Sequence, residues 1–457
     1  MANAAANQGL MVAIVEKGRM GGTCLNRGCI PSKLLIHSAD VMETIKTAGA
    51  FGIRVERVSV DYKKIISRVN GIIDNDSDSI RSAFEGLDNP LLFPTEGRFI
   101  GEKRIDVGGQ TITAPKILIA TGTRPVIPKI NGLKESNYIT SDQALRLENQ
   151  PKTLTIIGGG YIAAELAHFF GSLGSTINIV QQKDLLIPSE DEDISKKFTE
   201  LFSQKYNVFL GCNTELVTKK KELYHVIARK TNTGESVEIE SDQLLVATGR
   251  IPNSDTLDLA KSGVKTDQEG FIEVDEKLET NVKGIFALGD AVGKYQFRHS
   301  ANWEAQYVFN NIMATVNDKK IAVDYFAMPR AIFSSPQVAA VGYTEQELKR
   351  KEAAEGREMD YVKSLYPFNK TAMGEAIDDR EGFVKFLIER KTRRILGCHI
   401  IGTDASILIH EVLVAMKAGG GGRGRGSNDT LGNILRTIHI HPALSEVISR
   451  AATSVFD

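Results

Sequence analysis

Two cysteines, Cys24 and Cys29, stand five positions apart in a chain that has only four. In a regular helix this spacing separates the Cα atoms by about 7.5 Å along the axis, whereas a disulfide tolerates only about 4.4–6.8 Å. A bond between them therefore requires a distorted helix start, and Gly28 can relax the backbone there. A strained bond is reduced easily, as a redox pair must be. Two unpaired core cysteines and half of a zinc site are the alternatives.

The surrounding composition favours a redox catalyst over a disulfide-stapled secreted fold. The Gly-Gly-Thr sequence before Cys24 is typical of a helix N-terminus, which stabilises a thiolate. The 457 residues suffice for about three domains. A net charge of −1 gives no reason to expect a nucleic-acid partner. No apolar run is long enough to cross a membrane, and one close cysteine pair in a Cys-poor chain indicates a cytoplasmic protein.

A complete dinucleotide-binding unit follows in the middle of the chain. Residues 153–157 are expected to form a strand, 164–173 a helix and 176–180 the next strand. Between the first strand and the helix lies a G-x-G-x-x-A turn, in which Gly158 and Gly160 let backbone amides approach a pyrophosphate. The alternative is a plain tight turn.

The start of the chain resembles such a unit only in part. Residues 1–9 are expected to form the second half of a helix, and residues 10–16 a buried strand that ends in Glu16, where an acid holds an adenosine ribose. The preceding strand and its Gly-rich turn are absent, so we expect either an N-terminal truncation or a nucleotide site built differently. Residues 117–125 and 244–252 echo each other, each an apolar strand ending in Ala-Thr-Gly, and residues 284–290 end similarly in Gly-Asp.

The last third of the chain changes character. Strands are expected at 383–388 and 395–400 and a helix at 406–417, which indicates an α+β domain with an antiparallel sheet. The fold class is therefore α/β, with two Rossmann-like dinucleotide-binding domains and a C-terminal α+β domain. The low-complexity run 419–427 is rich in Gly and Arg. It predicts a flexible surface loop, with an RGG-type nucleic-acid segment as the alternative.

Two histidines near the C-terminus alternate in a stretch that could be a strand. His439 and His441 would then lie on one face, but no pattern of cysteines or carboxylates completes a metal site, and none is predicted. Pro442 suits the first turn of a helix, which would place Glu446 about one turn inside. There it can orient His441 as a general base near neutral pH, which leaves His439 a structural role.

Together these motifs resemble the flavoprotein disulfide reductases, the class I pyridine nucleotide-disulfide oxidoreductases, and most of all the dihydrolipoamide dehydrogenases. The resemblance also includes Ile332-Phe333-Ser334-Ser335-Pro336. It implies an FAD-binding domain at 1–149 with a truncated start, an NAD(P)-binding domain at 150–266, a central segment at 267–335 and a dimerisation domain at 336–457. It also implies sites for FAD at Glu16, Lys33, Thr121, Gly122 and Asp290, and for NAD at Gly158, Gly160, Tyr161, Gln181 and Gly249.

The resemblance further assigns roles in catalysis. Cys29 would lie against the flavin as the charge-transfer thiol, and Cys24 would exchange with substrate. Lys33 would lie near the flavin and pair with Glu165, since each charge is costly to bury alone. Tyr161 would shield the flavin. The His441–Glu446 pair would reach the disulfide of the partner subunit, which implies a homodimer.

The expected substrate is a small dithiol or disulfide, or a lipoyl group, with NAD(H) as the nicotinamide partner. NADP remains possible, because Gln181 lacks the repulsion that an acid has for a 2′-phosphate and Lys183 is near. Residues 298–305 resemble mycothione reductases, so a mycothione- or glutathione-type reductase using NAD(P)H is the alternative. A non-catalytic nucleotide-binding scaffold is the alternative from another class, should the incomplete start prevent FAD from binding.

Overall fold

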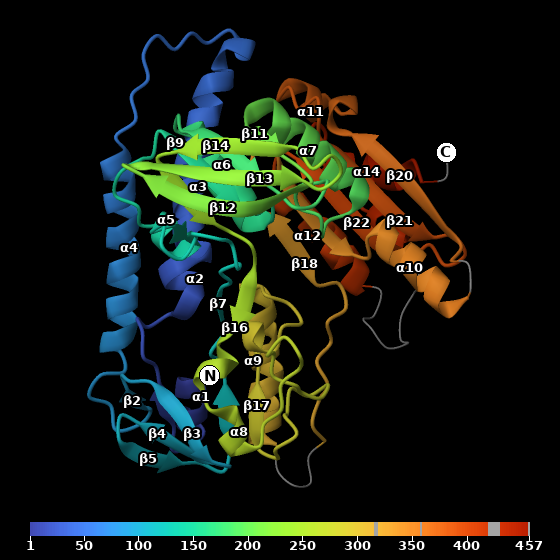
Figure 1. Ribbon diagram of the computed structural model, residues 1–457. Coiled ribbons are helices and arrows are strands. Elements are labelled where there is room, and N and C mark those ends of the chain that lie inside the picture. Colours follow the sequence, from blue (N-terminus) through green and yellow to red (C-terminus); the bar gives the residue numbers. More distant parts are fainter. Residues whose placement is uncertain (315–318, 357–358, 419–429, 456–457) are drawn as a thin grey trace.

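The computed structural model describes residues 1–314, 319–356, 359–418 and 430–455. Its chain forms two mixed α/β regions and a C-terminal sheet covered by helices (Figure 1), so the predicted fold class is confirmed. The Gly/Arg-rich run 419–427 lies outside the described residues. Within the described residues, no helix is both long and apolar enough to cross a membrane.

The middle region is built on a five-stranded parallel sheet in the order β11-β10-β9-β15-β8. The predicted strand at 176–180 is present as β10, and α6 follows β9 across the glycine turn. A three-stranded antiparallel sheet, β12-β13-β14, packs its apolar face on the parallel sheet. The elements are β8 (Ile139–Thr140), α5 (Ser141–Ala144), β9 (Thr153–Ile157), α6 (Tyr161–Ser172), β10 (Thr176–Val180), α7 (Glu192–Lys205), β11 (Asn207–Phe209), β12 (Cys212–Lys220), β13 (Leu223–Lys230), β14 (Ser236–Ser241) and β15 (Gln243–Val246).

The first region has two separate pairs of parallel strands. β1 pairs with β2, and β6 pairs with β17, each as a two-stranded sheet. The strand predicted at 10–16 is shorter than expected: β1 spans only Ala13–Val15, and Met11 is 83% exposed. Hydrogen bonds to a neighbour on one edge alone support a short strand. The elements are α1 (Ala2–Asn7), β1, β2 (Leu91–Phe93), β3 (Gly97–Gly101), β4 (Arg104–Val107), β5 (Gln110–Thr113), β6 (Ile117–Ile119) and β17 (Ile285–Ala287).

Two long helices and a strand ribbon connect these regions. α3 packs against α6 through an apolar core that includes Leu35, Ala39 and Phe169. α4 begins after Asp61, whose side chain accepts from the backbone amide of Lys64 at 3.0 Å. The elements are α2 (Gly22–Arg27), α3 (Cys29–Thr47), η1 (Ala48–Phe51), α4 (Tyr62–Ser82), β7 (Thr123–Pro125), β16 (Arg250–Pro252), η2 (Asn253–Thr256), α8 (Leu259–Ser262), η3 (Gly289–Ala291) and α9 (Arg298–Met313).

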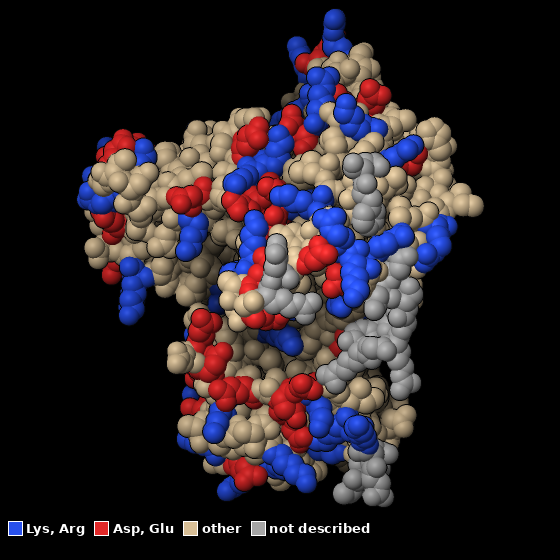
Figure 2. All heavy atoms as spheres, turned by 90° about the vertical axis from the view of Figure 1, so that its right-hand side faces the viewer, with Lys and Arg blue, Asp and Glu red and all other residues tan. Residues whose placement is uncertain are grey.

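The C-terminal region is an antiparallel sheet in the order β18-β19-β22-β21-β20. The predicted strands are β21 and β22, both almost wholly buried, and the predicted helix is α12. Charges of both signs are interspersed on this side of the molecule (Figure 2). The elements are β18 (Pro329–Ile332), β19 (Gln337–Gly342), α10 (Glu345–Glu355), β20 (Tyr361–Pro367), η4 (Phe368–Lys370), α11 (Ala372–Ala376), β21 (Phe383–Glu389), β22 (Ile395–Gly402), α12 (Ala405–Ala418), α13 (Thr430–Leu435) and α14 (Glu446–Thr453).

A buried ion cluster fastens this sheet to the middle region. Lys385, on β21, is 1% exposed and donates to Asp191 at 2.7 Å, Asp193 at 2.6 Å and Glu345 at 2.8 Å. Asp191 and Asp193 lie at the start of α7, and Glu345 opens α10. A buried ammonium needs such partners, because desolvation alone would expel its charge. The cluster therefore holds the C-terminal sheet at a fixed place against the middle region.

Candidate active site

The two cysteines lie on either side of a break between two helices. α2 ends at Arg27 and α3 begins at Cys29, with Gly28 between them at φ −148° and ψ −114°. A Cβ on Gly28 would lie 2.9 Å from the carbonyl oxygen of Thr23, so only glycine fits there without a shift. The distorted helix start that the spacing required is thus present. Both cysteines are half-buried.

A buried asparagine braces the turn that leads into α2. The side-chain amide of Asn26 donates to the carbonyl oxygens of Met20 at 2.9 Å and Gly22 at 3.1 Å. Ser77, on α4, also donates to Met20, at 2.8 Å. These bonds fix the loop before Cys24 against α4. The structural roles of Asn26 and Ser77 could not be predicted from the sequence, since neither residue belongs to a spacing pattern.

The two thiols share one proton near neutral pH. The hydrogen bond with Cys29 lowers the pKa of Cys24 to about 6, against desolvation and with help from the Arg298 charge. The same hydrogen bond, together with burial, raises the pKa of Cys29. The two titrations belong to the pair, and the side chains around it favour the thiolate on Cys24. The charge-transfer role of Cys29 beside a flavin stays a prediction.

The expected ion pair between Lys33 and Glu165 is present next to the cysteines. Lys33 Nζ lies 2.8 and 2.9 Å from the two carboxylate oxygens of Glu165, whose side chain is only 9% exposed. The backbone N–H of Phe333 donates to the same carboxylate at 3.1 Å, and Lys33 lies 4.4 Å from the centre of the Phe333 ring. The ion pair therefore connects α3, α6 and the segment that follows β18, which is part of the Ile332–Pro336 motif.

Tyr161 lies where the glycine turn ends. It is the first residue of α6 and is 40% exposed. Burial raises the pKa of its hydroxyl; the Arg250 charge opposes this shift, and the charges of Asp290, Glu165 and Cys29 add to it. The shielding of a flavin by Tyr161 stays a prediction.

The glycines before Tyr161 differ in what surrounds them. A Cβ on Gly158 would lie 2.3 Å from the carbonyl oxygen of Ala247, at φ +111°, so this position requires glycine for close packing. A Cβ on Gly160 would enter open space. That space at the start of α6, where backbone amides are unpaired, is where a pyrophosphate binds in this type of turn.

The two Ala-Thr-Gly turns are linked by side chains that follow them. Thr123 Oγ1 donates to Asp290 at 2.8 Å and accepts from Arg250 Nε at 2.8 Å. Asn253 donates to the carbonyl oxygen of Thr121 at 2.8 Å. Thr121 and Gly122 therefore lie just before β7, and Gly249 lies just before β16, at the other end of the antiparallel ribbon that these two strands form. Asp290, in η3, is tied to this ribbon through Thr123. The shared Ala-Thr-Gly letters could not reveal Thr123 and Arg250, because their hydrogen bond joins segments far apart in the sequence.

The two residues predicted to bind adenosine riboses differ in their exposure and in their hydrogen-bond partners. Glu16 is half-buried and accepts a hydrogen bond from the Gly18 amide at 2.7 Å. Gln181 is 7% exposed, and its amide donates to the Leu185 carbonyl at 3.2 Å. Ribose binding by Gln181 stays a prediction, and the structure adds that its amide nitrogen already has a partner.

His441 and Glu446 form the expected pair, but in a different local structure. The Nδ1 atom of His441 lies 3.0 and 3.2 Å from the carboxylate oxygens of Glu446, which also accept from the Ala443 amide at 3.2 Å. The hydrogen bond with His441 lowers the pKa of Glu446. The predicted strand at 437–441 is wrong, because these residues pair with no strand. Pro442 follows a cis peptide, and the helix begins only at Glu446.

The His441 side chain is 71% exposed. It precedes α14, which Figure 1 shows well apart from α2 of the same chain. His439 instead lies against α12, with Nε2 2.5 Å from Glu411, and only 11% of its side chain is exposed. The two histidines therefore differ in exposure: His441 faces outward and His439 is held against α12. Their different roles stay predictions.

The residues present fit a dinucleotide in the middle region: a tight first glycine, an open position at Gly160 and a helix N-terminus behind it. For FAD they supply Glu16, the turn at Gly122 and Asp290. The binding of each nucleotide by these residues stays a prediction.

Comparison with known proteins identifies the family. The profile described as pyridine nucleotide-disulphide oxidoreductase matches residues 1–305, and that of the corresponding dimerisation domain matches residues 328–452. This chain belongs to the pyridine nucleotide-disulphide oxidoreductases. It is therefore an enzyme of that family, whose members use FAD and NAD(P)H.

Individual relatives of this oxidoreductase differ in their names. It is 35% identical to mycothione reductase from Mycobacterium tuberculosis, over 96% of this chain and 93% of that protein. It is also 35% identical to dihydrolipoyl dehydrogenase from Cupriavidus necator, over 96% and 90%. Among solved structures, the HOCl-induced flavoprotein disulfide reductase RclA from Escherichia coli matches with a TM-score of 0.84 and 26% identity, over 99% and 96%. The family is thus established, and these names leave its substrate open.

Proposed function

We propose that this oxidoreductase passes electrons between NAD(H) and a small dithiol or disulfide through Cys24 and Cys29, with dihydrolipoamide or a protein-bound lipoyl group as its substrate. The observation that carries the proposal is the thiol pair at the Gly28 helix break, which keeps one thiolate near neutral pH. The exposed His441, held by Glu446, supplies a base that can move a thiol proton.

The oxidising half of the reaction uses this chain's own residues. With Cys24 and Cys29 bonded, a substrate thiol gives its proton to His441 and its sulfur attacks Cys24. A mixed disulfide forms, the Cys24–Cys29 bond breaks and Cys29 leaves as a thiolate. The second substrate thiol then attacks the substrate sulfur of the mixed disulfide, which closes the substrate disulfide and releases the Cys24 sulfur, and its proton stays on the cysteine pair. Two electrons now reside in the cysteine pair, and bound FAD supplies the chemistry that transfers them to NAD⁺ as hydride.

The base is proposed to act across a homodimer. The family's dimerisation domain supports a dimer, and so do exposed apolar side chains beside His441: Ile438 is 97% exposed and Ile440 78% exposed. On α12, which His439 contacts through Glu411, Ile407 is 67% and Val414 68% exposed. A second copy that covers this surface would bring its cysteines to His441.

A mycothione-type reductase is the second candidate. It is supported by Arg298, which acts electrostatically on Cys24 from the start of α9, by the resemblance of residues 298–305 and by the mycothione reductase comparison. The charge of Arg298 acts on Cys24, the thiol proposed to exchange with substrate. It therefore offers a contact that could select among disulfides.

One experiment separates these proposals. The purified protein is scanned for flavin absorbance and then assayed for NAD⁺ reduction by dihydrolipoamide and for NADH and NADPH oxidation by mycothiol and glutathione disulfides. We expect a yellow protein with its highest kcat/KM for dihydrolipoamide and NAD⁺, and no turnover in Cys24→Ser. A preference for mycothiol disulfide would favour the second candidate. A colourless protein without activity would favour the non-catalytic scaffold.

A further inference from the structure

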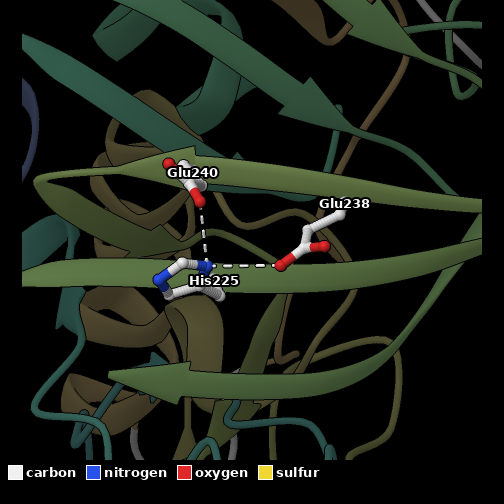
Figure 3. A group of neighbouring side chains, drawn as sticks. All are labelled: His225, Glu238 and Glu240. Carbon is white, nitrogen blue, oxygen red and sulfur yellow. Dashed lines mark hydrogen bonds and ion pairs between the residues drawn. The ribbon is translucent and has the colours of Figure 1, made fainter. Parts of the chain in front are cut away.

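A group of possible metal ligands lies on the three-stranded sheet of the middle region (Figure 3). His225 comes from β13, and Glu238 and Glu240 come from β14. The Nδ1 atom of His225 lies 3.3 Å from Glu238 Oε1 and 3.2 Å from Glu240 Oε1. In the described part of the chain, this is the one group of three such residues with ligand atoms within 4.8 Å of one another.

The strand register forces this convergence. His225 lies directly opposite Glu240, and Glu238 is two residues along the same strand. Because strand side chains alternate, all three project from one face, about 5 Å apart across the strands and about 7 Å apart along β14. The opposite face carries Val226 and Ile239, both buried in the core of the middle region. The backbone under the three ligands is therefore fixed by a packed sheet and not by a loop.

The charges on this face of β13 and β14 favour the binding of a cation. Glu238 and Glu240 are side by side on one face, with side chains 60% and 58% exposed, while His225 is only 15% exposed. On the other side of β13, the residue opposite His225 is the uncharged Thr218, and Lys220 lies two residues further along β12 on the same face. Arg229 shares the face, but its Nε already donates to Glu215 at 2.8 Å. The ligand atoms of the two carboxylates lie within 4.8 Å of each other, a separation at which their charges repel and a cation between them is favoured.

We propose that His225, Glu238 and Glu240 form a binding site for a divalent transition cation of the Zn²⁺ class. Bonds of about 2.0–2.1 Å from a tetrahedral ion to imidazole nitrogen and carboxylate oxygen place the ligand atoms about 3.3 Å from one another. The two separations from His225 Nδ1, 3.2 and 3.3 Å, already match this value. One imidazole and two carboxylates are ligands that zinc accepts, and water would complete the coordination. The exposed carboxylates can turn to the ion without moving the strands.

The test is Zn²⁺ titration of the tag-free, flavin-loaded protein in competition with a chromogenic chelator. Its accessible thiols are first alkylated, because a free thiolate also binds zinc. We expect one Zn²⁺ per chain, with affinity at least about ten-fold weaker in His225→Gln and in Glu240→Gln. Glu222→Gln is the matched control, since this glutamate is 95% exposed on the turn between β12 and β13 and outside the group. It should bind Zn²⁺ within about two-fold of wild type.

Circular dichroism and the flavin spectrum establish that each variant is folded. Addition of Co²⁺ to the wild type should produce the visible absorbance of a four-coordinate cobalt ion, over and above that of the flavin. This absorbance should be absent in His225→Gln. No Zn²⁺ uptake by the alkylated wild type, or uptake that His225→Gln leaves unchanged, would overturn the proposal. The three residues would then form a hydrogen-bonded ion pair only.

Discussion

The low pKa of Cys24 gives a quantitative prediction. The hydrogen bond with Cys29 is the largest cause that lowers it from 9.0 to about 6. Cys29→Ala removes that donor and should return the Cys24 pKa to near 9. Cys29→Ser keeps a hydroxyl donor and should give a value in between. Arg298→Gln removes a weaker cause and should raise the pKa by less than Cys29→Ala does.

The reaction rate alone would underestimate this change. At pH 7 a thiol of pKa 6 is about 90% ionised and one of pKa 9 about 1%, a ratio of about 90. The more basic thiolate is, however, about 20-fold more nucleophilic for a Brønsted coefficient of about 0.45. The net loss of rate in Cys29→Ala is then only about four- to five-fold. The pH midpoint of the rate, and not its size, is therefore the decisive quantity.

The assay follows the initial rate with a pyridyl disulfide between pH 4.5 and 10 on pre-reduced, anaerobic protein. Cys212 and Cys398 are buried and should not contribute. Wild type should show a midpoint near 6 and Cys29→Ala one near 9. A midpoint near 6 in Cys29→Ala would refute the hydrogen bond as the cause. A simultaneous large rise in Arg298→Gln would then assign the effect to the Arg298 charge.

Two other predictions concern stability and the base. Lys385→Met removes the ammonium that pairs with the buried Asp191 and should cost about 3–5 kcal/mol in urea unfolding followed by tryptophan fluorescence; a loss below about 1 kcal/mol would contradict the role of the buried ion cluster. Although burial opposes it, the hydrogen bond from Lys385 lowers the Glu345 pKa from 4.5 to about 2. The stabilisation of the fold by this ion pair is therefore complete above pH 4.5 and is lost as the pH falls towards 2. His441→Gln should reduce turnover about 10²–10⁴-fold and His439→Gln far less, and equal losses would argue against the division of roles.

Local sequence patterns predicted strands correctly where the strand has hydrogen-bonded neighbours in a sheet. The strand at 176–180 is present with the predicted bounds, since β10 is hydrogen-bonded on both sides. The pattern at 437–441 failed, although it alternates, because no strand lies beside it and both isoleucines face outward. Alternation indicates a strand only where a partner satisfies the backbone.

The candidate site was predictable to the extent that each residue belongs to a motif. The pairing of Lys33 with Glu165 was predictable because both residues belong to motifs that carry the family resemblance. Thr123 and Arg250 were not, since their hydrogen bonds link segments more than a hundred residues apart. The metal-ligand group was equally invisible, because only the register of β13 against β14 brings His225 to the two glutamates.

The most direct test of the central claim is an anaerobic titration of the flavin-loaded protein with NADH. If Cys24 and Cys29 form a redox disulfide in electronic contact with FAD, wild type must take up twice the reducing equivalents of Cys29→Ser, because disulfide and flavin each accept one pair of electrons. Equal uptake by the two proteins, with the flavin fully reduced in both, would contradict the claim that this cysteine pair is the redox centre.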